Sequence, residues 1–308
     1  MHKNISWLED RIAGDGPVVV IDGGMGTQLE KSGVPMDSRV WSGRAVLSHP
    51  DAVRQAHEDF INAGAEVIIA NTFAAARHML EPGGLGDHVE EINLNAVRLA
   101  QQARDRVATE AVAIAGSICE WAPADDLKWH NPEAVGRSAR EQAELLAEAE
   151  VDLIAMEMCQ TSAFSVAVIE AALETGLPVW IGVSAQAHKG CETLSVFDNE
   201  ALEFEQLVKD LAGYPAMMMN IMHTPLPDVD QAIEIARRHW PGAIGVYPES
   251  GYFAMPNWQF VDVIEPGELA TAASTWVEQG VRMIGGCCGL GPEHIIALRR
   301  LINHSVRV

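Results

Sequence analysis

The chain has 308 residues, 48% of them hydrophobic and 21% charged, so it can bury a substantial core, which excludes a disordered, collagen-like or coiled-coil protein. Its 43 acidic residues outnumber its 21 basic residues and give a formal net charge of −22. Such a surface repels phosphates, so the composition excludes nucleic-acid binding and is otherwise typical of a soluble protein.

The chain shows no signal for export or membrane insertion. Residues 1–16 lack the apolar segment of a signal peptide, and apolar runs such as 66–70 (EVIIA) are far shorter than the roughly 18–20 residues that span a bilayer. The five cysteines are an odd number without a secretory context, which favours a reducing compartment. We therefore expect a cytoplasmic protein without a membrane partner. Whether it forms a homo-oligomer stays open.

Short apolar runs alternate eight times with longer amphipathic stretches. The runs predict strands over residues 17–24, 66–73, 111–118, 152–159, 178–185, 216–223, 243–249 and 282–289. The stretches between them predict helices over residues 50–63, 88–108, 132–150, 161–176, 200–212, 227–239, 267–279 and 292–303. Prolines at positions 50, 132 and 292 mark the starts of three of these helices.

Eight consecutive strand–helix pairs predict a (β/α)8 TIM barrel, an α/β fold, built as a single domain over residues 1–308. Nearly continuous apolar strands are typical of a parallel sheet covered on both faces, and a doubly wound open sheet is the alternative architecture. In a barrel the active site lies at the C-terminal ends of the strands. The polar residues expected at these ends are Asp22, Asn71, Thr72, Ser117, Cys119, Glu157, Cys159, Ser184, Asn220, His223, Tyr247, Glu249, Cys287 and Cys288.

Two adjacent cysteines, Cys287 and Cys288, lie between glycines at the end of the last predicted strand. The geometry of a disulfide makes a bond between neighbours unfavourable, whereas glycines let the backbone turn both sulfurs toward one metal ion. Zinc sites usually space their cysteines as CxxC, so two small apolar side chains packed at a strand end are the other interpretation. The spacing alone leaves both interpretations open.

The first predicted strand ends in a glycine-rich turn that begins at Asp22. Gly23 and Gly24 allow a ligand to approach the backbone and leave N–H groups for an anion such as a carboxylate, although a tight turn alone also requires glycine. Glu157 lies among apolar residues and needs a partner, which is a substrate ammonium group, a structural cation or a retained proton. A lone histidine such as His223 is either a hydrogen-bonded core residue or a metal ligand.

These residues resemble the homocysteine S-methyltransferase family, in the same order and over nearly the whole chain. The segments that carry the resemblance are 22–30 (DGGMGTQLE), 40–43 (VWSG), 63–73 (AGAEVIIANTF), 115–117 (AGS), 152–158 (DLIAMEM), 247–251 (YPESG) and 285–295 (GGCCGLGPEHI).

The resemblance implies a zinc-dependent barrel enzyme that transfers a methyl group to the thiol of homocysteine and gives methionine. It implies that Cys287 and Cys288 bind Zn²⁺. It also implies contacts to the amino-acid end of homocysteine from Asp22, Gly23, Gly24, Thr72 and Glu157. Asn220 matches the asparagine on the family's sixth strand, near the metal, and is with Glu157 a predicted catalytic residue.

The sequence departs from the family at the third zinc ligand. The family has a cysteine directly after the asparagine, where this chain has Ile221. His223 could replace that cysteine as a zinc ligand. Side chains alternate between the two faces of a strand, so His223 and Ile221, two residues apart, are expected to point to the same face. Cys119 or Cys159 could supply the third ligand instead, and alternation places Cys159 on the side of Glu157. The third hypothesis is weak or absent zinc with altered chemistry.

The partners implied are a small-molecule thiol acceptor and an onium methyl donor, first S-methylmethionine or S-adenosylmethionine and then a betaine-like or other sulfonium compound. A cationic donor favours aromatic faces, and Trp41, Trp121 and Tyr247 lie in segments at the barrel mouth. Two alternatives remain: a barrel methyltransferase with no metal or another acceptor, and a non-catalytic protein that binds a thiol or a metal.

Overall fold

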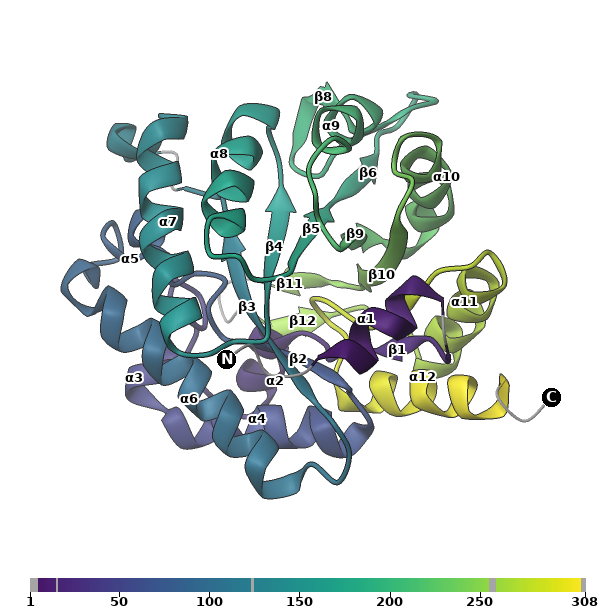
Figure 1. Cartoon of the computed structure of the whole chain (residues 1–308), viewed down its shortest axis with the longest axis horizontal. Coiled ribbons are helices and arrows are strands. Elements are labelled where there is room, and N and C mark those ends of the chain that lie inside the picture. Colours follow the sequence, from purple (N-terminus) through teal and green to yellow (C-terminus); the bar gives the residue numbers. More distant parts are fainter. Residues whose placement is uncertain (1–4, 15, 123–124, 255–258, 306–308) are drawn as a thin grey trace.

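The computed structural model describes residues 5–14, 16–122, 125–254 and 259–305. Residues 1–4 and 15, which belong to the N-terminal segment predicted to lack a signal peptide, lie outside the described residues. Eight parallel strands form one sheet in the order β1-β13-β10-β9-β5-β4-β3-β2 (Figure 1). A parallel bridge between Ile21 and Val67 joins the two outer strands and closes the ring. The predicted (β/α)8 barrel is thus confirmed.

The barrel strands are β1 (Val19–Val20), β2 (Val67–Ala70), β3 (Ala113–Cys119), β4 (Leu153–Cys159), β5 (Val179–Val183), β9 (Met218–Pro225), β10 (Ala243–Glu249) and β13 (Met283–Ile284). The helices are α1 (Ser6–Ala13), α2 (Met25–Lys31), α3 (Ala45–Ser48), α4 (Pro50–Ala63), α5 (Arg77–Leu80), α6 (Val89–Val107), α7 (Pro132–Glu148), α8 (Ser162–Leu173), α9 (Phe204–Leu211), α10 (Val229–His239), α11 (Pro266–Glu278) and α12 (Pro292–Ser305). Two small antiparallel sheets add β6 (Ala185–Ala187), β7 (Leu194–Val196) and β8 (Asn199–Glu203), and β11 (Tyr252–Ala254) and β12 (Gln259–Val261).

Each predicted strand overlaps one barrel strand, although β3 and β9 extend one and two residues past the predicted ends, and α4 has the predicted bounds 50–63. The prediction was wrong at the start of the helix over 200–212, because residues 199–203 form β8 and α9 begins at Phe204. These residues pair with β7 in an antiparallel ladder, and that pairing outweighs their helical pattern.

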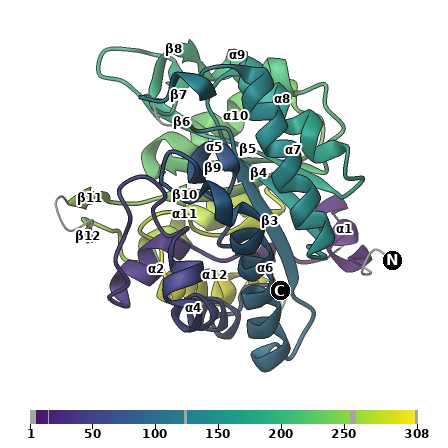
Figure 2. The ribbon, with the colours of Figure 1, turned by 90° about the vertical axis from the view of Figure 1, so that its left-hand side faces the viewer.

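Helix α1 and the two small sheets lie at opposite sides of the molecule (Figure 2). Leu8 and Ile12 of α1 pack with Val19, Met218 and Met283 inside the barrel, so α1 covers the end from which the strands start. The small sheets follow β5 and β10 and extend the opposite end of the barrel. The site expected at the C-terminal ends therefore lies on their side.

The strands have two packed faces. Inward residues such as Ala155 and Met222 form one cluster, and outward residues such as Met156 and Ile221 pack against the helices in another. This division decides which side chains reach the barrel interior. None of the helices in the described ranges has the length and hydropathy that crossing a lipid bilayer requires.

Candidate active site

Three side chains with metal-binding atoms meet at the C-terminal end of the barrel: His223, Cys287 and Cys288. One ligand atom from each lies within 4.8 Å of the others, and they are the one such group among the described residues. The Nδ1 atom of His223 lies 3.4 Å from the sulfur of Cys287. Two thiols and an imidazole are ligands that zinc prefers, so the donor set has the chemistry of a zinc site.

A β-bulge turns His223 toward the cysteines. Strand β9 pairs with β10 at Met222 and Tyr247 and next at Pro225 and Glu249, so β9 contains one extra residue between the two pairs. His223 has a φ of 45°, in the left-handed region. The alternation of side chains between the two faces of β9 therefore breaks at the bulge. Ile221 faces outward, so the expectation that His223 points to the same face was wrong. His223 does lie beside both cysteines.

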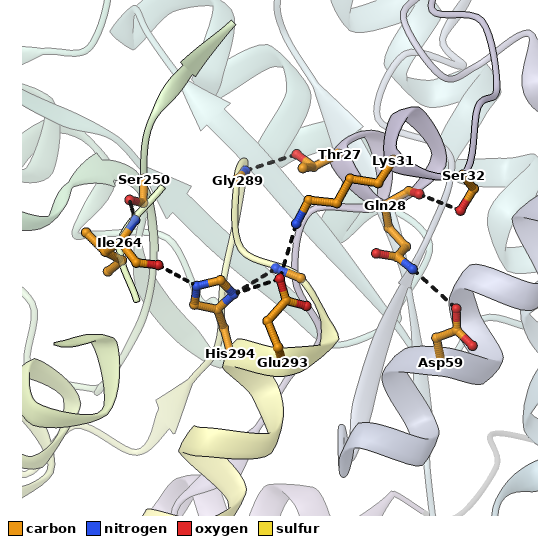
Figure 3. A network of polar contacts seen from close by, with 11 residues as sticks. Thr27, Gln28, Lys31, Ser32, Asp59, Ser250, Ile264, Gly289, Glu293 and His294 are labelled. Atoms are coloured by element: carbon orange, nitrogen blue, oxygen red, sulfur yellow. Dashed lines mark hydrogen bonds and ion pairs between the residues drawn. The ribbon is translucent and has the colours of Figure 1, made fainter. Parts of the chain in front are cut away.

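Main-chain hydrogen bonds attach the Cys287–Cys288 segment to its neighbours. The N–H of Cys287 donates to Pro248 and the carbonyl of Cys288 accepts from Ser250, both at the end of β10. Gly289, with a φ of 84°, donates its N–H to the hydroxyl of Thr27 (Figure 3). A Cβ at Gly289 would lie 1.9 Å from the carbonyl oxygen of Ser250, so this close turn requires glycine.

His294 connects the same segment to the start of α11. Its Nδ1 accepts from the N–H of Gly291, and its Nε2–H donates to the carbonyl of Ile264 (Figure 3). The N–H of Ile264 in turn donates to the hydroxyl of Ser250. Ser250 also donates its N–H to the carbonyl of Cys288, so these hydrogen bonds form a closed network. The positions of the two cysteines therefore depend on contacts with the end of β10, the start of α11 and the start of α12.

The charges in this group favour one thiolate and one imidazolium. The thiol of Cys287, which donates a hydrogen bond, and the nearby charge of His223 lower the pKa of Cys288. Burial alone would lower the pKa of His223, but the charges of Cys288 and Glu249 outweigh it and raise that pKa to about 9. A bound cation would replace the proton on His223 and stabilise the thiolates.

A buried carboxyl group, that of Glu157 on β4, faces the barrel interior. Its oxygens accept hydrogen bonds from the hydroxyls of Ser117 on β3 and, over 3.2 Å, of Tyr247 on β10. Burial raises its pKa to about 7, and the two hydrogen bonds oppose that rise. Both partners are neutral donors, so Glu157 can still bind a cation.

Asp22 is a second buried carboxyl group at the same end. Its Oδ2 accepts the N–H of Ile69 over 2.7 Å, and its Oδ1 is buried with no hydrogen-bond partner among the described residues. Burial, and to a lesser extent the charge of Glu157, raises its pKa well above the usual range. A cationic ligand between Asp22 and Glu157 would satisfy both groups.

A family model described as Homocysteine S-methyltransferase matches residues 19–302, which is most of the chain. The chain belongs to the homocysteine S-methyltransferase family. It is therefore a methyltransferase, and the reaction of its family is the transfer of a methyl group to homocysteine, which gives methionine. The family is zinc-dependent, and the His223–Cys287–Cys288 group is the possible ligand group here.

Relatives and a solved structure agree with this assignment. The chain is 27% identical to Homocysteine S-methyltransferase 1 of Zea mays, over 96% of this chain and 98% of the relative. It is 28% identical to Homocysteine S-methyltransferase YbgG of Bacillus subtilis (strain 168), over 91% of this chain and 92% of the relative. The metallated crystal structure of the homocysteine methyltransferase MmuM from Escherichia coli has the same fold, with a TM-score of 0.76 at 24% identity over 96% of this chain and 98% of that one.

The glycine-rich turn is packed tightly against the cysteine segment. The N–H of Gly24 donates to the carbonyl of Leu290, so it is not free for an anion. A Cβ at Gly23 would lie 2.2 Å from the same carbonyl oxygen. Thr72 is buried, and its hydroxyl accepts the N–H of Ser117 and donates to the carbonyl of that residue. These groups shape the site, while the polar atoms of Gly24 and Thr72 are engaged within the protein.

Asn220 lies deeper in the barrel than the metal-binding group. In the sheet it pairs with Gly182 of β5 and Gly245 of β10, one inward position below Met222. Both polar atoms of its amide are buried without a partner among the described residues. A Cβ at Gly245 would lie 2.2 Å from its Oδ1, so the amide occupies the space that this glycine leaves.

Trp41 forms an aromatic cluster with two residues from neighbouring segments. Its ring stacks on Phe73 and Trp121 with centroids 5.4 and 5.1 Å away. The cluster packs against Cys119, the last residue of β3. Tyr247 is separate from this cluster and is buried beside Glu157.

Neither Cys119 nor Cys159 belongs to the metal-binding group. The thiol of Cys119 donates to the carbonyl of Phe73, and burial raises its pKa. The expectation that Cys159 faces the barrel mouth with Glu157 was wrong. Met158 between them has a φ of 57°, the register of β4 shifts there, and Cys159 packs in the outward cluster.

Two residues that contact His223, Glu249 and Phe197, have no predicted role in the site from the sequence alone. The Nε2 of His223 lies 3.0 Å from Oε2 of Glu249, and the ring of Phe197 packs edge-on against the imidazole with centroids 4.7 Å apart. The sequence predicts Glu249 at a strand end, but no local sequence pattern predicts the β-bulge that brings it next to His223. Phe197 lies between β7 and β8, whose sheet was not predicted.

Proposed function

We propose that this enzyme methylates the thiol of homocysteine in a zinc site formed by His223, Cys287 and Cys288, with a small sulfonium compound as the methyl donor. The observation that carries the proposal is the convergence of three metal-binding atoms within 4.8 Å at the C-terminal end of the barrel. Two thiols and an imidazole form a donor set that suits zinc.

When bound there, zinc supplies Lewis-acid chemistry that lowers the pKa of a thiol at its open position. The thiolate is the nucleophilic form of the acceptor. In the transfer, the acceptor sulfur forms a bond to the methyl carbon while the carbon–sulfur bond of the donor breaks. The electron pair of that bond stays on the donor sulfur, which leaves as a neutral thioether.

The residues of the chain bind and orient the two substrates in this proposal. Glu157 and Asp22 hold the ammonium group of homocysteine, which supplies the cation that their buried oxygens lack. Asn220 offers hydrogen bonds from the floor of the site. The close packing at Gly23, Gly24 and Thr72 shapes the pocket for the amino-acid end of the acceptor.

The donor lies against aromatic faces in this proposal. Trp41 and the rings stacked with it offer π-faces to a sulfonium or ammonium group, and Tyr247 bounds the site near Glu157. S-methylmethionine and S-adenosylmethionine are the first donors to test, followed by betaine-like compounds. Holding donor and acceptor in line supplies much of the catalysis in such a transfer.

The decisive experiment combines metal analysis with a donor screen. We expect one zinc per chain, methyl transfer to homocysteine from at least one sulfonium donor, and loss of both in Cys287→Ser and Cys288→Ser. Cys191→Ser is the matched control, because Cys191 is exposed and outside the group. Zinc-free protein that methylates at the full rate would overturn the zinc site, and zinc binding without transfer from any donor would favour a binding protein.

His223→Ala tests the third ligand separately. We expect its zinc affinity to fall sharply while the fold, followed by circular dichroism, is retained. Unchanged zinc affinity in this variant would exclude His223 as a ligand and leave the two cysteines as the protein part of the site.

A further inference from the structure

The carboxylate of Glu249 is the polar group on the far side of the His223 imidazole from the cysteines. Its Oε2 lies 3.0 Å from Nε2, while Nδ1 lies 3.4 Å from the sulfur of Cys287. The side chains of His223 and Glu249 are only 15% and 14% exposed, so water competes little for this contact. The two ring nitrogens thus face two different kinds of group.

A neutral imidazole has one N–H donor and one nitrogen lone pair. A carboxylate accepts but cannot donate, so Glu249 favours the form in which Nε2 carries the hydrogen. The lone pair is then on Nδ1, the nitrogen that points toward the cysteines. A carboxylate that accepts this N–H also makes the other nitrogen more basic, which strengthens its bond to a metal.

The imidazole is also restrained by packing. The extra residue of the β9 bulge sets the direction of the side chain, and Phe197 packs edge-on against the ring at an interplanar angle of 76°. Phe197 is itself anchored, because its N–H donates to the carbonyl of Ser184 at the end of β5. The ring therefore has little freedom to exchange its two nitrogens by rotation.

We propose that Glu249 is the positioning residue of the metal site: it binds the Nε2–H of His223 and presents Nδ1 as the ligand atom to an ion held by Cys287 and Cys288. This inference rests on the proposed zinc site and adds a role for a residue outside the ligand group. Glu249 is not itself a ligand in this arrangement, because the group whose donor atoms lie within 4.8 Å of one another contains His223 and the two cysteines alone among the described residues.

The test measures zinc affinity by competition with a chromophoric chelator in the full-length protein. Loss of a carboxylate that orients a histidine ligand typically weakens metal binding about 10- to 100-fold, and we expect this range for Glu249→Ala. Glu249→Gln keeps an oxygen that accepts the Nε2–H and should lose less. Equal affinity in wild type and Glu249→Ala would overturn the proposal.

A matched control is available at a second histidine–glutamate pair. His239 Nε2 lies 2.7 Å from Oε1 of Glu205, on the helices α10 and α9 outside the barrel. Glu205→Ala removes the same kind of contact away from the site and should leave zinc affinity unchanged. A similar loss in Glu205→Ala would mean that the effect is general destabilisation, and would count against Glu249.

A spectroscopic measurement separates positioning from a merely structural role. In protein labelled with ¹⁵N-histidine and loaded with cadmium, we expect cadmium coupling to Nδ1 of His223 in wild type. In Glu249→Gln the same coupling should weaken, with retained thiolate bands in the cobalt-substituted protein. Cadmium coupling to Nε2 in wild type would overturn the proposal.

The zinc site and the role of Glu249 can fail independently. If Cys287→Ser binds zinc as tightly as wild type, the zinc site itself is wrong. If Cys287→Ser loses zinc and Glu249→Ala does not, the zinc site stands and only the role of Glu249 falls. If Glu249→Ala loses zinc as completely as the cysteine variant, Glu249 is a ligand rather than a positioning residue.

Discussion

Tyr247 on β10 donates its hydroxyl across the barrel interior to Oε1 of Glu157 on β4, over 3.2 Å. Two strands, β9 and β5, separate β10 from β4 in the sheet, so this bond crosses the interior and does not follow a strand pair. Together with Ser117 it holds the buried carboxyl group in one orientation. The geometry suits a carboxylate that binds an ammonium group of fixed position.

Tyr247→Phe should therefore weaken acceptor binding more than it changes stability. A hydrogen bond to a charged group contributes roughly 1.5–3 kcal/mol, so we expect the KM for homocysteine to rise about tenfold or more. Steady-state kinetics measures the change, and Tyr252→Phe is the control because Tyr252 is 57% exposed. An unchanged KM would mean that Glu157 does not bind the acceptor.

Glu120 should make the protein less stable as the pH rises. Burial raises its pKa to about 7 from 4.5, despite hydrogen bonds from Ser165, Gln160 and Thr161. Between these values the folded state holds a proton that the unfolded state has lost, so the free energy of unfolding falls as pH rises through this window.

Glu120→Gln should flatten that decline, because glutamine does not titrate. Urea denaturation at several pH values from about 4.5 to 7 measures how the free energy of unfolding declines. The total decline is roughly 1.4 kcal/mol for each unit by which the folded-state pKa exceeds the unfolded-state pKa. The exposed Glu148→Gln should keep the wild-type slope. A Glu120→Gln slope equal to that of wild type would contradict the prediction.

Cys159→Ala should leave the zinc content unchanged and lower stability. Its sulfur packs among apolar side chains between β4 and the helices, so its removal leaves a small cavity that costs about 1 kcal/mol. Elemental analysis and thermal denaturation measure the two effects. Loss of zinc from this variant would show that a sulfur from β4 reaches the metal after all.

Gly23→Ala should disturb the cysteine segment. The new Cβ would lie 2.2 Å from the carbonyl oxygen of Leu290, two residues after Cys288. Overpacking of this kind costs about 1–3 kcal/mol, and the shift should also weaken zinc binding. Denaturation and chelator competition measure both quantities.

Gly26→Ala is the control in the same turn. The nearest atom to its Cβ is 3.8 Å away and the residue lies in α2, so alanine should be tolerated or slightly stabilising. Equal behaviour of the Gly23 and Gly26 variants would contradict the packing argument.

The pattern of apolar and amphipathic segments was enough to predict the barrel and the end of it that holds the site. Eight apolar runs separated by amphipathic stretches leave few other arrangements, and parallel strands bring their C-terminal ends to one side. Because Cys287, Cys288 and His223 all lie at or just after the C-terminal ends of strands, their proximity could be predicted before their geometry was known.

Which side chains face one another could not be predicted from the sequence, because it depends on how the strands pair. Alternation placed Cys159 with Glu157 and His223 with Ile221, and both predictions failed at residues with positive φ, Met158 and His223. Each of these lies where the register between neighbouring strands shifts. A register shift depends on pairing with a strand distant in sequence, so local alternation cannot reveal it, and the contact between His223 and Glu249 arises from that pairing.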